Sequence, residues 1–270
     1  MVCIFVASHA YMKNIKFANL FLFISFPICL FAQQPIQANK DSVTQQSVKT
    51  RGLNPPQIKS FIIPAVLITY GFVALNNNAL RKLDVSTRDE IQEDHPLFAN
   101  HLDNYLRFVP GVAFYGLNLA GVKSKHSVAD GTGLYVLSEA IMGVSTFTVK
   151  HAADRNRPDG SNNYSFPSGH TASAFASAEF LNQEYRDVSP WIGYAGYAVA
   201  TATGAFRLYN NRHWVSDVVA GAGFGIASTK VAYLLYPHLK RMLSGAKNTN
   251  VSLVPTYQQQ TIGLAFNATF

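Results

Sequence analysis

The sequence contains little cysteine and little charge. Its 270 residues include two cysteines, Cys3 and Cys29, and both lie near the N-terminus. This placement excludes a disulfide framework for the rest of the chain. Only 14% of the residues are charged, and no grouping of Asp, Glu and His has the spacing of a metal site. The sequence therefore predicts a protein that works without a metal or another cofactor.

A dense basic stripe is also absent. Proteins that bind nucleic acid carry clustered Lys and Arg residues or a recognisable motif, and this sequence has neither. The formal net charge of +7 nevertheless favours anionic partners. The expected partners are therefore phosphate groups and anionic lipid, with no nucleic acid among them.

The first 32 residues have the parts of an export signal. Basic residues follow Met12, an apolar stretch covers residues 20–31, and Ala32 ends that stretch. We interpret residues 1–32 as a signal peptide, with Met12 as the expected translation start. An uncleaved membrane anchor is the alternative. Residues 33–58 are polar and rich in Gln, Ser and Pro, which is typical of a flexible leader. The chain is thus expected to be exported to the cell envelope.

Apolar segments recur through residues 59–240, separated by loops that carry Gly, Asn, Asp and Pro. This pattern is typical of helices. The six segments of the expected core are residues 61–75, 106–122, 134–149, 168–181, 191–206 and 214–236. Residues 79–105 are charged and amphipathic, which predicts one or two surface helices broken near Pro96. Pro237 is expected to end the last helix. The predicted domain is an all-α bundle with a six-helix core.

The tail, residues 241–270, has a different pattern. Val251–Val254 and Thr261–Phe266 are mainly apolar and are separated by polar residues rich in Gln. Short β-prone runs around a polar connection are typical of a hairpin. The tail is therefore predicted to form a short β-hairpin.

Two arrangements of the apolar segments remain open. A membrane-spanning helix needs about 20 predominantly apolar residues, and several segments are shorter or carry an acidic residue such as Glu139 or Glu179. A bundle partly embedded in a membrane and a soluble exported bundle both agree with this pattern. In either arrangement, the export signal favours the periplasmic side for the polar clusters described next.

Three polar clusters lie between the apolar segments, in residues 150–158, 167–170 and 207–217. Charged groups beside apolar surface are costly unless they bind something. In the first cluster Lys150 ends a segment and Arg157 follows, held in direction by Pro158. Arg binds an oxyanion as a bidentate fork and Lys as a point charge. This pair can bind a phosphoryl group, although a solvated basic loop is the better explanation of the cluster taken alone.

The second cluster is Pro167-Ser168-Gly169-His170, at the expected start of a helix. A helix N-terminus offers free N–H groups to an anion, and Gly169 lets the anion approach the backbone closely. Ser168 either caps the helix or donates its hydroxyl to the anion. His170 is placed to give a proton to a leaving oxygen. An ordinary capped helix with a surface histidine is the alternative.

The third cluster contains Arg207, His213 and Asp217. His213 and Asp217 are four residues apart, which on a helix brings them to one face. A carboxylate on one imidazole nitrogen fixes the tautomer and leaves the other nitrogen free to attack. A helix salt bridge is the alternative for this pair.

Taken in order, the three clusters resemble the signature of the type 2 phosphatidic acid phosphatase superfamily. That signature is Lys-x6-Arg-Pro, then Pro-Ser-Gly-His, then Ser-Arg-x5-His-x3-Asp. The chain has Lys150-x6-Arg157-Pro158, Pro167-Ser168-Gly169-His170 and Arg207-x5-His213-x3-Asp217. The resemblance covers about residues 61–236. Phe206 is a departure, because the signature has Ser at this position.

The resemblance implies a helical domain of the acid phosphatase/haloperoxidase type and a metal-independent phosphatase. His213 would attack phosphorus and form a phosphohistidine, Asp217 would orient it, and His170 would protonate the leaving group. The phosphate-binding residues would be Lys150, Arg157, Ser168, Gly169 and Arg207.

Several substrates and two other activities agree with this resemblance. The apolar segments favour a membrane-associated enzyme for a lipid phosphate, namely a lipid A phosphate, a polyprenyl diphosphate, phosphatidic acid or phosphatidylglycerol phosphate. A soluble periplasmic non-specific acid phosphatase, acting on small phosphate esters, is the main alternative. A vanadium-dependent haloperoxidase is a remote one. His151, Arg155 and Arg212 neighbour the clusters and are candidates for supporting or headgroup-binding roles.

Overall fold

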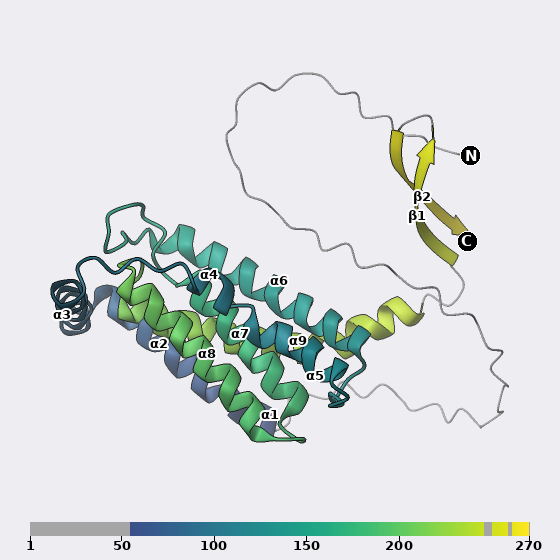
Figure 1. The fold of residues 1–270 in the computed structure, drawn as a ribbon, viewed down its shortest axis with the longest axis horizontal. Coiled ribbons are helices and arrows are strands. Elements are labelled where there is room, and N and C mark those ends of the chain that lie inside the picture. Colours follow the sequence, from purple (N-terminus) through teal and green to yellow (C-terminus); the bar gives the residue numbers. More distant parts are fainter. Residues whose placement is uncertain (1–54, 246–249, 259–260, 270) are drawn as a thin grey trace. The chain divides into compact units, whose positions relative to one another are not determined.

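The computed structural model describes residues 55–245, 250–258 and 261–269 (Figure 1). The expected signal peptide and all but the last four residues of the expected leader lie outside these ranges. Within the described residues there are nine helices and two strands. The helices are α1 (Pro55–Ser60), α2 (Ile62–Asn76), α3 (Asn78–Asp94), α4 (Asp103–Leu106), α5 (Val109–Leu119), α6 (Val128–Ala153), α7 (Gly169–Tyr185), α8 (Pro190–Tyr209) and α9 (Val215–Gly245).

All six predicted core segments are helical, as α2 and α5 to α9, which confirms the all-α domain. The charged stretch also breaks into α3 and α4 around Pro96, as expected. The expected end of the last helix at Pro237 is wrong, because α9 continues through this residue to Gly245. A proline inside a helix removes one backbone hydrogen bond. The Leu, Lys, Arg and Met residues that follow favour the helix and continue it.

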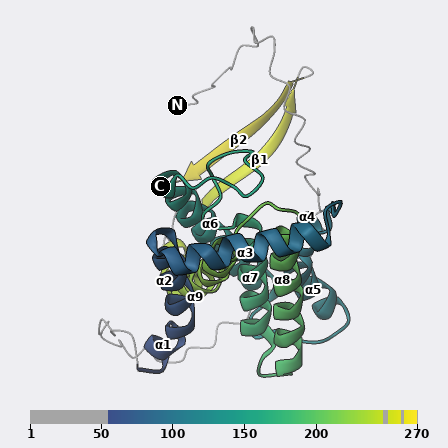
Figure 2. The same ribbon diagram turned by 90° about the vertical axis from the view of Figure 1, so that its left-hand side faces the viewer.

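Helix α7 is the centre of the helical domain. It packs against α5, α6, α8 and α9, and most of its residues are buried. Its C-terminal half contributes Phe180, Leu181 and Tyr185 to a buried cluster that also contains Phe114 of α5 and Leu134 of α6. Figure 2 shows α3 lying across one end of the other helices. The packing of α7 against four other helices fixes the position of its N-terminus.

Two glycines of α9, Gly221 and Gly225, allow this helix to lie directly on α7. A Cβ atom on Gly221 would lie 2.6 Å from the carbonyl oxygen of Ser168. A Cβ atom on Gly225 would lie 2.8 Å from the amide nitrogen of Ala176 and would also overlap the carbonyl oxygen of Ala172. Backbone atoms cannot move away as a flexible side chain can. The close packing of α9 on α7 therefore requires glycine at these two positions.

Replacing Gly225 with alanine is expected to destabilise the domain by about 3 kcal/mol or more, because overpacking here pushes α9 away from α7. Gly143→Ala is the matched control. A Cβ atom at Gly143 of α6 meets nothing within 4 Å, and alanine is favoured over glycine in a helix by roughly 0.5–1 kcal/mol. Thermal unfolding in detergent should show a lower midpoint for the first variant and an unchanged or higher one for the second. Equal midpoints would contradict the packing described here.

Two of the described helices, Val128–Ala153 and Val215–Met242, are long and apolar enough to cross a membrane. Helices α2 and α3 also pass this test as a pair, with a bend of 93° between them. The bend occurs at Asn77, whose side chain accepts hydrogen bonds from the amides of Ala79 and Leu80 and so starts α3. Large apolar side chains are exposed on the outer faces of α2 and α6, namely Ile62, Ile63, Val66, Val73, Val136, Val144 and Phe147. These faces are suited to lipid.

The tail forms the predicted hairpin. Strands β1 (Asn250–Gln258) and β2 (Thr261–Thr269) are antiparallel. Their register pairs Asn250 with Thr269 and Gln258 with Thr261, so the strands match along their whole length.

Candidate active site

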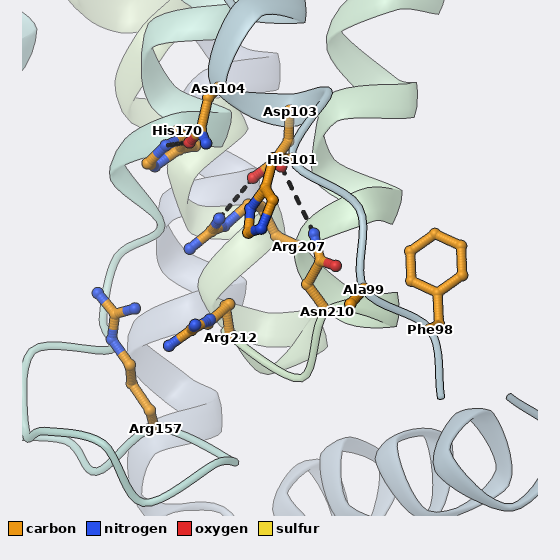
Figure 3. Close-up of a pocket in the computed structure, with 10 residues that line it drawn as sticks. All are labelled: Phe98, Ala99, His101, Asp103, Asn104, Arg157, His170, Arg207, Asn210 and Arg212. Carbon is orange, nitrogen blue, oxygen red and sulfur yellow. Dashed lines mark hydrogen bonds and ion pairs between the residues drawn. The ribbon is translucent and has the colours of Figure 1, made fainter. Parts of the chain in front are cut away.

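The three polar clusters meet where α6 ends, α7 begins, α8 ends and α9 begins. A cavity of about 300 Å³ opens at this place (Figure 3). Its lining residues are Phe98, Ala99, His101, Asp103, Asn104, Arg157, His170, Arg207, Asn210 and Arg212. Three of the predicted site residues, Arg157, His170 and Arg207, therefore share one cavity.

Lys150 lies in the last turn of α6, beside the start of α7. Its Nζ atom donates to the carbonyl oxygens of Tyr164 and Pro167, the former at 3.0 Å. A Cβ atom on Gly169 would lie 3.7 Å from Cε of Lys150. The ammonium group is thus held next to the free N–H groups at the N-terminus of α7, as predicted for an anion site.

A short loop carries Arg157 back towards the same place. The amide of Arg157 donates to the carbonyl oxygen of Asn162 at 2.9 Å, and the amide of Ser165 donates to that of Arg155 at 2.9 Å. Among the described residues, Nε of Arg157 and Nε of Arg207 are buried without a hydrogen-bond partner. Burial and the nearby Arg207 lower the pKa of Arg157. These two buried donors leave hydrogen-bonding capacity for an acceptor at the cavity.

Ser168 acts as the N-cap of α7 in this structure. Its side chain is buried and accepts a hydrogen bond from the amide of Thr171, whose hydroxyl lies 2.9 Å from the Ser168 hydroxyl. Of the two roles predicted for Ser168, the structure shows the cap. Donation of its hydroxyl to an anion stays a prediction.

His170 faces the cavity from the first turn of α7. Its Nε2 lies 2.9 Å from Oδ1 of Asn104, and this nitrogen carries a proton because an amide oxygen can only accept. Burial lowers the pKa of His170 to about 3, with the charges of Arg207, Arg107, His213 and Arg157 adding to the effect. A bound anion would offset these charges and raise the pKa again.

His213 lies before α9, not on it, because the helix begins at Val215. The reasoning from helical spacing was therefore wrong, although the two side chains do meet. Nδ1 of His213 lies 3.6 Å from Oδ2 of Asp217, and both side chains are buried. Burial lowers the pKa of His213 to about 4, although the Asp217 carboxylate opposes this shift. At neutral pH the ring is thus uncharged and has a nitrogen lone pair available.

Arg155 and Asp84 support Asp217. Nη1 of Arg155 donates to Oδ1 of Asp217 at 2.6 Å, and Nη2 donates to Oδ2 of Asp84 at 2.7 Å. The other Asp217 oxygen, Oδ2, accepts from the hydroxyl of Ser165 and from the amide of Trp214. Arg155 therefore points inward and positions the carboxylate, which excludes it as a headgroup ligand.

Asp84 was assigned to a surface helix by its sequence pattern, yet its side chain is 2% exposed. It also accepts from the amide and hydroxyl of Ser216, at 2.9 and 2.6 Å. The signal that could have found it is charge balance, because an arginine buried among apolar helices needs carboxylate partners.

A second set of residues that sequence reasoning missed comes from the segment before and within α4. Oδ2 of Asp103 accepts from Nη1 of Arg207 at 2.5 Å, and both side chains are buried. Asn210 donates to the carbonyl oxygen of Asn100 at 2.7 Å and accepts from its amide at 3.0 Å. This segment therefore contacts two predicted site residues: Asp103 binds Arg207, and Asn104 binds His170.

The two remaining neighbours of the clusters behave differently. Nδ1 of His151 lies 2.8 Å from the carbonyl oxygen of Phe147 in its own helix, and the side chain is exposed away from the cavity. Arg212 lines the cavity and donates to Oδ2 of Asp159 at 2.9 Å. Arg212 remains a candidate headgroup ligand, whereas His151 does not.

The fold and the cavity together define a helical protein with a cavity lined by arginine and histidine side chains at one end. Residues 131–241 match the family model described as PAP2 superfamily. This range holds all three polar clusters, from Lys150 to Asp217, and the match confirms the resemblance found in the sequence. The wall formed by residues 98–104 lies outside it.

One curated relative is a protein named lipid A 1-phosphatase from Porphyromonas gingivalis, 40% identical over 142 residues, which are 50% of this chain. The chain spans 31% of the length of that relative. Two solved structures are also similar. The transmembrane PAP2 type phosphatidylglycerolphosphate phosphatase from Bacillus subtilis has 19% identity and a TM-score of 0.46, over 66% of this chain and 98% of that one. Aquifex aeolicus LpxE has 20% identity and a TM-score of 0.41, over 54% and 93% of the two chains.

Proposed function

We propose that the chain is a metal-independent phosphatase that hydrolyses a phosphate monoester or diphosphate of a lipid through a phosphohistidine intermediate. One observation carries the proposal. His213 is buried and uncharged, its ring lies 3.6 Å from Asp217, and it is close enough to Arg207 and His170 to interact with them electrostatically. Arg157 interacts with His170 in the same way. A neutral imidazole beside buried cations is suited to attack on a phosphoryl group whose oxygens those cations hold.

In the first step, the free imidazole nitrogen of His213 forms a bond to phosphorus while the bond from phosphorus to the lipid oxygen breaks. The guanidinium groups of Arg157 and Arg207, with Lys150 and the amide of Gly169, bind the phosphoryl oxygens. The negative phosphoryl group raises the pKa of His170 and allows it to be protonated. His170 then gives its proton to the departing oxygen, which replaces the Asn104 oxygen as acceptor.

In the second step, neutral His170 takes a proton from water, and the resulting hydroxide attacks phosphorus. The bond from phosphorus to His213 breaks, which releases inorganic phosphate and restores the free imidazole. Asp217 stabilises the charged ring while the phosphohistidine exists and keeps its orientation for the next attack. Each step exchanges one bond to phosphorus, and the proton that His170 gives up in the first step is regained from water in the second.

A lipid is favoured as the substrate because the helices around the site carry apolar, exposed side chains and two of them can cross a membrane. The name of the curated relative adds lipid A as the leading candidate among the lipid phosphates. We place the enzyme in the cell envelope with the site facing the periplasm, which rests on the export signal in the sequence. A soluble acid phosphatase would lack a use for these exposed apolar faces.

The test is phosphate release from a panel of lipid A, phosphatidic acid, phosphatidylglycerol phosphate, a polyprenyl diphosphate and a soluble aryl phosphate. Wild-type protein should release phosphate from at least one lipid substrate faster than from the aryl phosphate, and excess EDTA should leave the rate unchanged. Rapid acid-free quenching with a labelled substrate should trap phosphate on histidine. Membranes washed with alkaline carbonate should retain the protein.

Three results would each count against part of this proposal. Loss of activity in EDTA would contradict the metal-independent mechanism. Release of the protein by carbonate, together with a preference for the aryl phosphate, would favour the soluble acid phosphatase. Label found on a residue other than histidine would contradict the phosphohistidine.

A further inference from the structure

One wall of the cavity is built by residues 98–104, which lie outside the part of the chain that matches the family model. We call residues 98–104 the headgroup wall. Four of its side chains line the cavity, namely Phe98, His101, Asp103 and Asn104 (Figure 3). Figure 3 draws Phe98 on the opposite side from Arg157 and His170. The cavity is therefore lined both by residues of the matched motifs and by a separate stretch of the chain, and the two sets contact each other through Asn104 with His170 and Asp103 with Arg207.

The headgroup wall is fixed to the end of α8 by several contacts. Asn100 and Asn210 exchange two hydrogen bonds, of 3.0 and 2.7 Å. The ring of Phe98 stacks on the ring of Phe206, with centroids 6.0 Å apart, and lies 5.3 Å from that of Tyr209. Aromatic pairs at such distances attract each other beyond the effect of their buried area. A wall held in this way presents its side chains at defined positions.

Phe206 is the residue that replaces the serine of the family signature. Its contact with Phe98 gives this replacement a physical role, because a serine hydroxyl at this position cannot stack on the ring. The chain has exchanged a small polar group beside Arg207 for an aromatic anchor of the headgroup wall. The departure from the signature is thus physically connected to the wall formed by residues 98–104.

The cavity is lined by two kinds of chemical group. Arg157, Arg207 and Arg212 supply permanent positive charge, which suits phosphoryl oxygens. The side-chain NH2 group of Asn104, the imidazole of His101 and the ring of Phe98 supply polar groups without permanent charge and an aromatic surface. A phosphatidic acid has little but ester and alkyl groups next to its phosphate and would leave these groups unused. Hydroxyl groups on a ring would pair with the Asn104 NH2 group and the His101 imidazole and lie against the aromatic ring.

We propose that residues 98–104 form a subsite for a sugar that carries the reacting phosphate, with His101, Asn104 and Phe98 as its specificity-determining contacts. This inference rests on the proposed phosphatase function. The sugar phosphate is either part of a lipid or free in solution, and the substrate panel below separates these two sources. A site built to hydrogen-bond hydroxyl groups rejects a substrate that lacks them by a large factor, up to about 10⁴–10⁵ in the strongest cases.

The experiment compares kcat/KM for three substrates: lipid A with its 1-phosphate, soluble glucose 1-phosphate, and phosphatidic acid in the same detergent. Wild-type protein should prefer lipid A over phosphatidic acid by at least tenfold. His101→Ala and Phe98→Ala should each lower kcat/KM for lipid A by fivefold or more and change that for phosphatidic acid by less than twofold. His101 is exposed, so its replacement leaves the fold intact.

Matched controls exist elsewhere in the helices. His238 of α9 and Tyr194 of α8 are exposed and lie outside the cavity, so His238→Ala and Tyr194→Ala should leave both rates within twofold of wild type. A lipid-linked sugar is supported if glucose 1-phosphate is hydrolysed slowly, and a free sugar phosphate if it is hydrolysed as fast as lipid A. Equal losses on lipid A and phosphatidic acid, or no loss on either, would overturn the sugar subsite. Absence of hydrolysis of all three substrates by wild-type protein would instead count against the phosphatase function itself.

Discussion

Replacing His213 with alanine is expected to lower kcat by at least about 10⁴-fold, which is typical for removal of a catalytic nucleophile. The ring is buried, uncharged at neutral pH and backed by Asp217, and no other histidine has this arrangement in the part of the chain that the structure describes. Phosphohistidine should be absent from the variant under conditions that trap it in the wild-type protein. Binding of inorganic phosphate should remain, because Arg157 and Arg207 are unchanged.

His151→Ala is the matched control for this prediction. His151 belongs to the first polar cluster, yet its ring bonds a carbonyl oxygen of its own helix and lies outside the cavity. Its replacement should leave kcat within about twofold. If His213→Ala keeps most of the activity while its fold is intact, His213 is not the nucleophile.

Replacing Arg155 with alanine is expected to have the largest effect on stability. Arg155 is the partner of two buried carboxylates, Asp84 and Asp217, whose side chains are 2% and 0% exposed. Removing one partner of a buried ion pair costs about 3–5 kcal/mol, because a charge is left buried and unpaired. For a domain of this size, the thermal midpoint in detergent should fall by on the order of 10 °C.

Two further variants test whether the loss of stability comes from the buried ion pairs or from the removal of any arginine charge. Arg186→Ala removes an exposed arginine that lies 3.9 Å from Asp187, and exposed pairs contribute about 0–1 kcal/mol. Its midpoint should change little. Arg155→Lys should recover only part of the loss, because a single ammonium group cannot hold two carboxylates as a guanidinium fork does. A midpoint for Arg155→Ala equal to that of Arg186→Ala would show that the network contributes nothing.

The grouping of the motif residues at one end of the helices was predictable from the sequence. Lys150, Arg157, His170, Arg207, His213 and Asp217 lie in short motifs, and each motif lies at the end of an apolar segment, so the helix order alone brings them to one end of the bundle. The helical segments were equally predictable, because apolar runs of this length between polar loops are typical of helices. Pro237 was assigned wrongly, since the residues after it support the helix more strongly than one proline disrupts it.

The rest of the site was not predictable in the same way. Asp84, Asp103 and Asn104 lie in a charged, amphipathic stretch, and nothing in their local pattern distinguishes a buried carboxylate from a solvated one. Their roles depend on contacts between residues more than 60 positions apart, such as Asp103 with Arg207 and Asn104 with His170. Such contacts follow from how α3 and α4 lie against α7 and α8, which the sequence pattern does not encode.

The ion pair between Asp103 and Arg207 has a consequence for turnover. Arg207 is buried, so an unpaired guanidinium between one substrate and the next would be costly. Asp103 serves as its resting partner and already neutralises part of its charge. On the proposed phosphatase function, the site should hold inorganic phosphate less tightly than it would with Arg207 unpaired, and the product should leave more readily. The carboxylate that weakens the binding of phosphate would thereby protect the enzyme from inhibition by its own product.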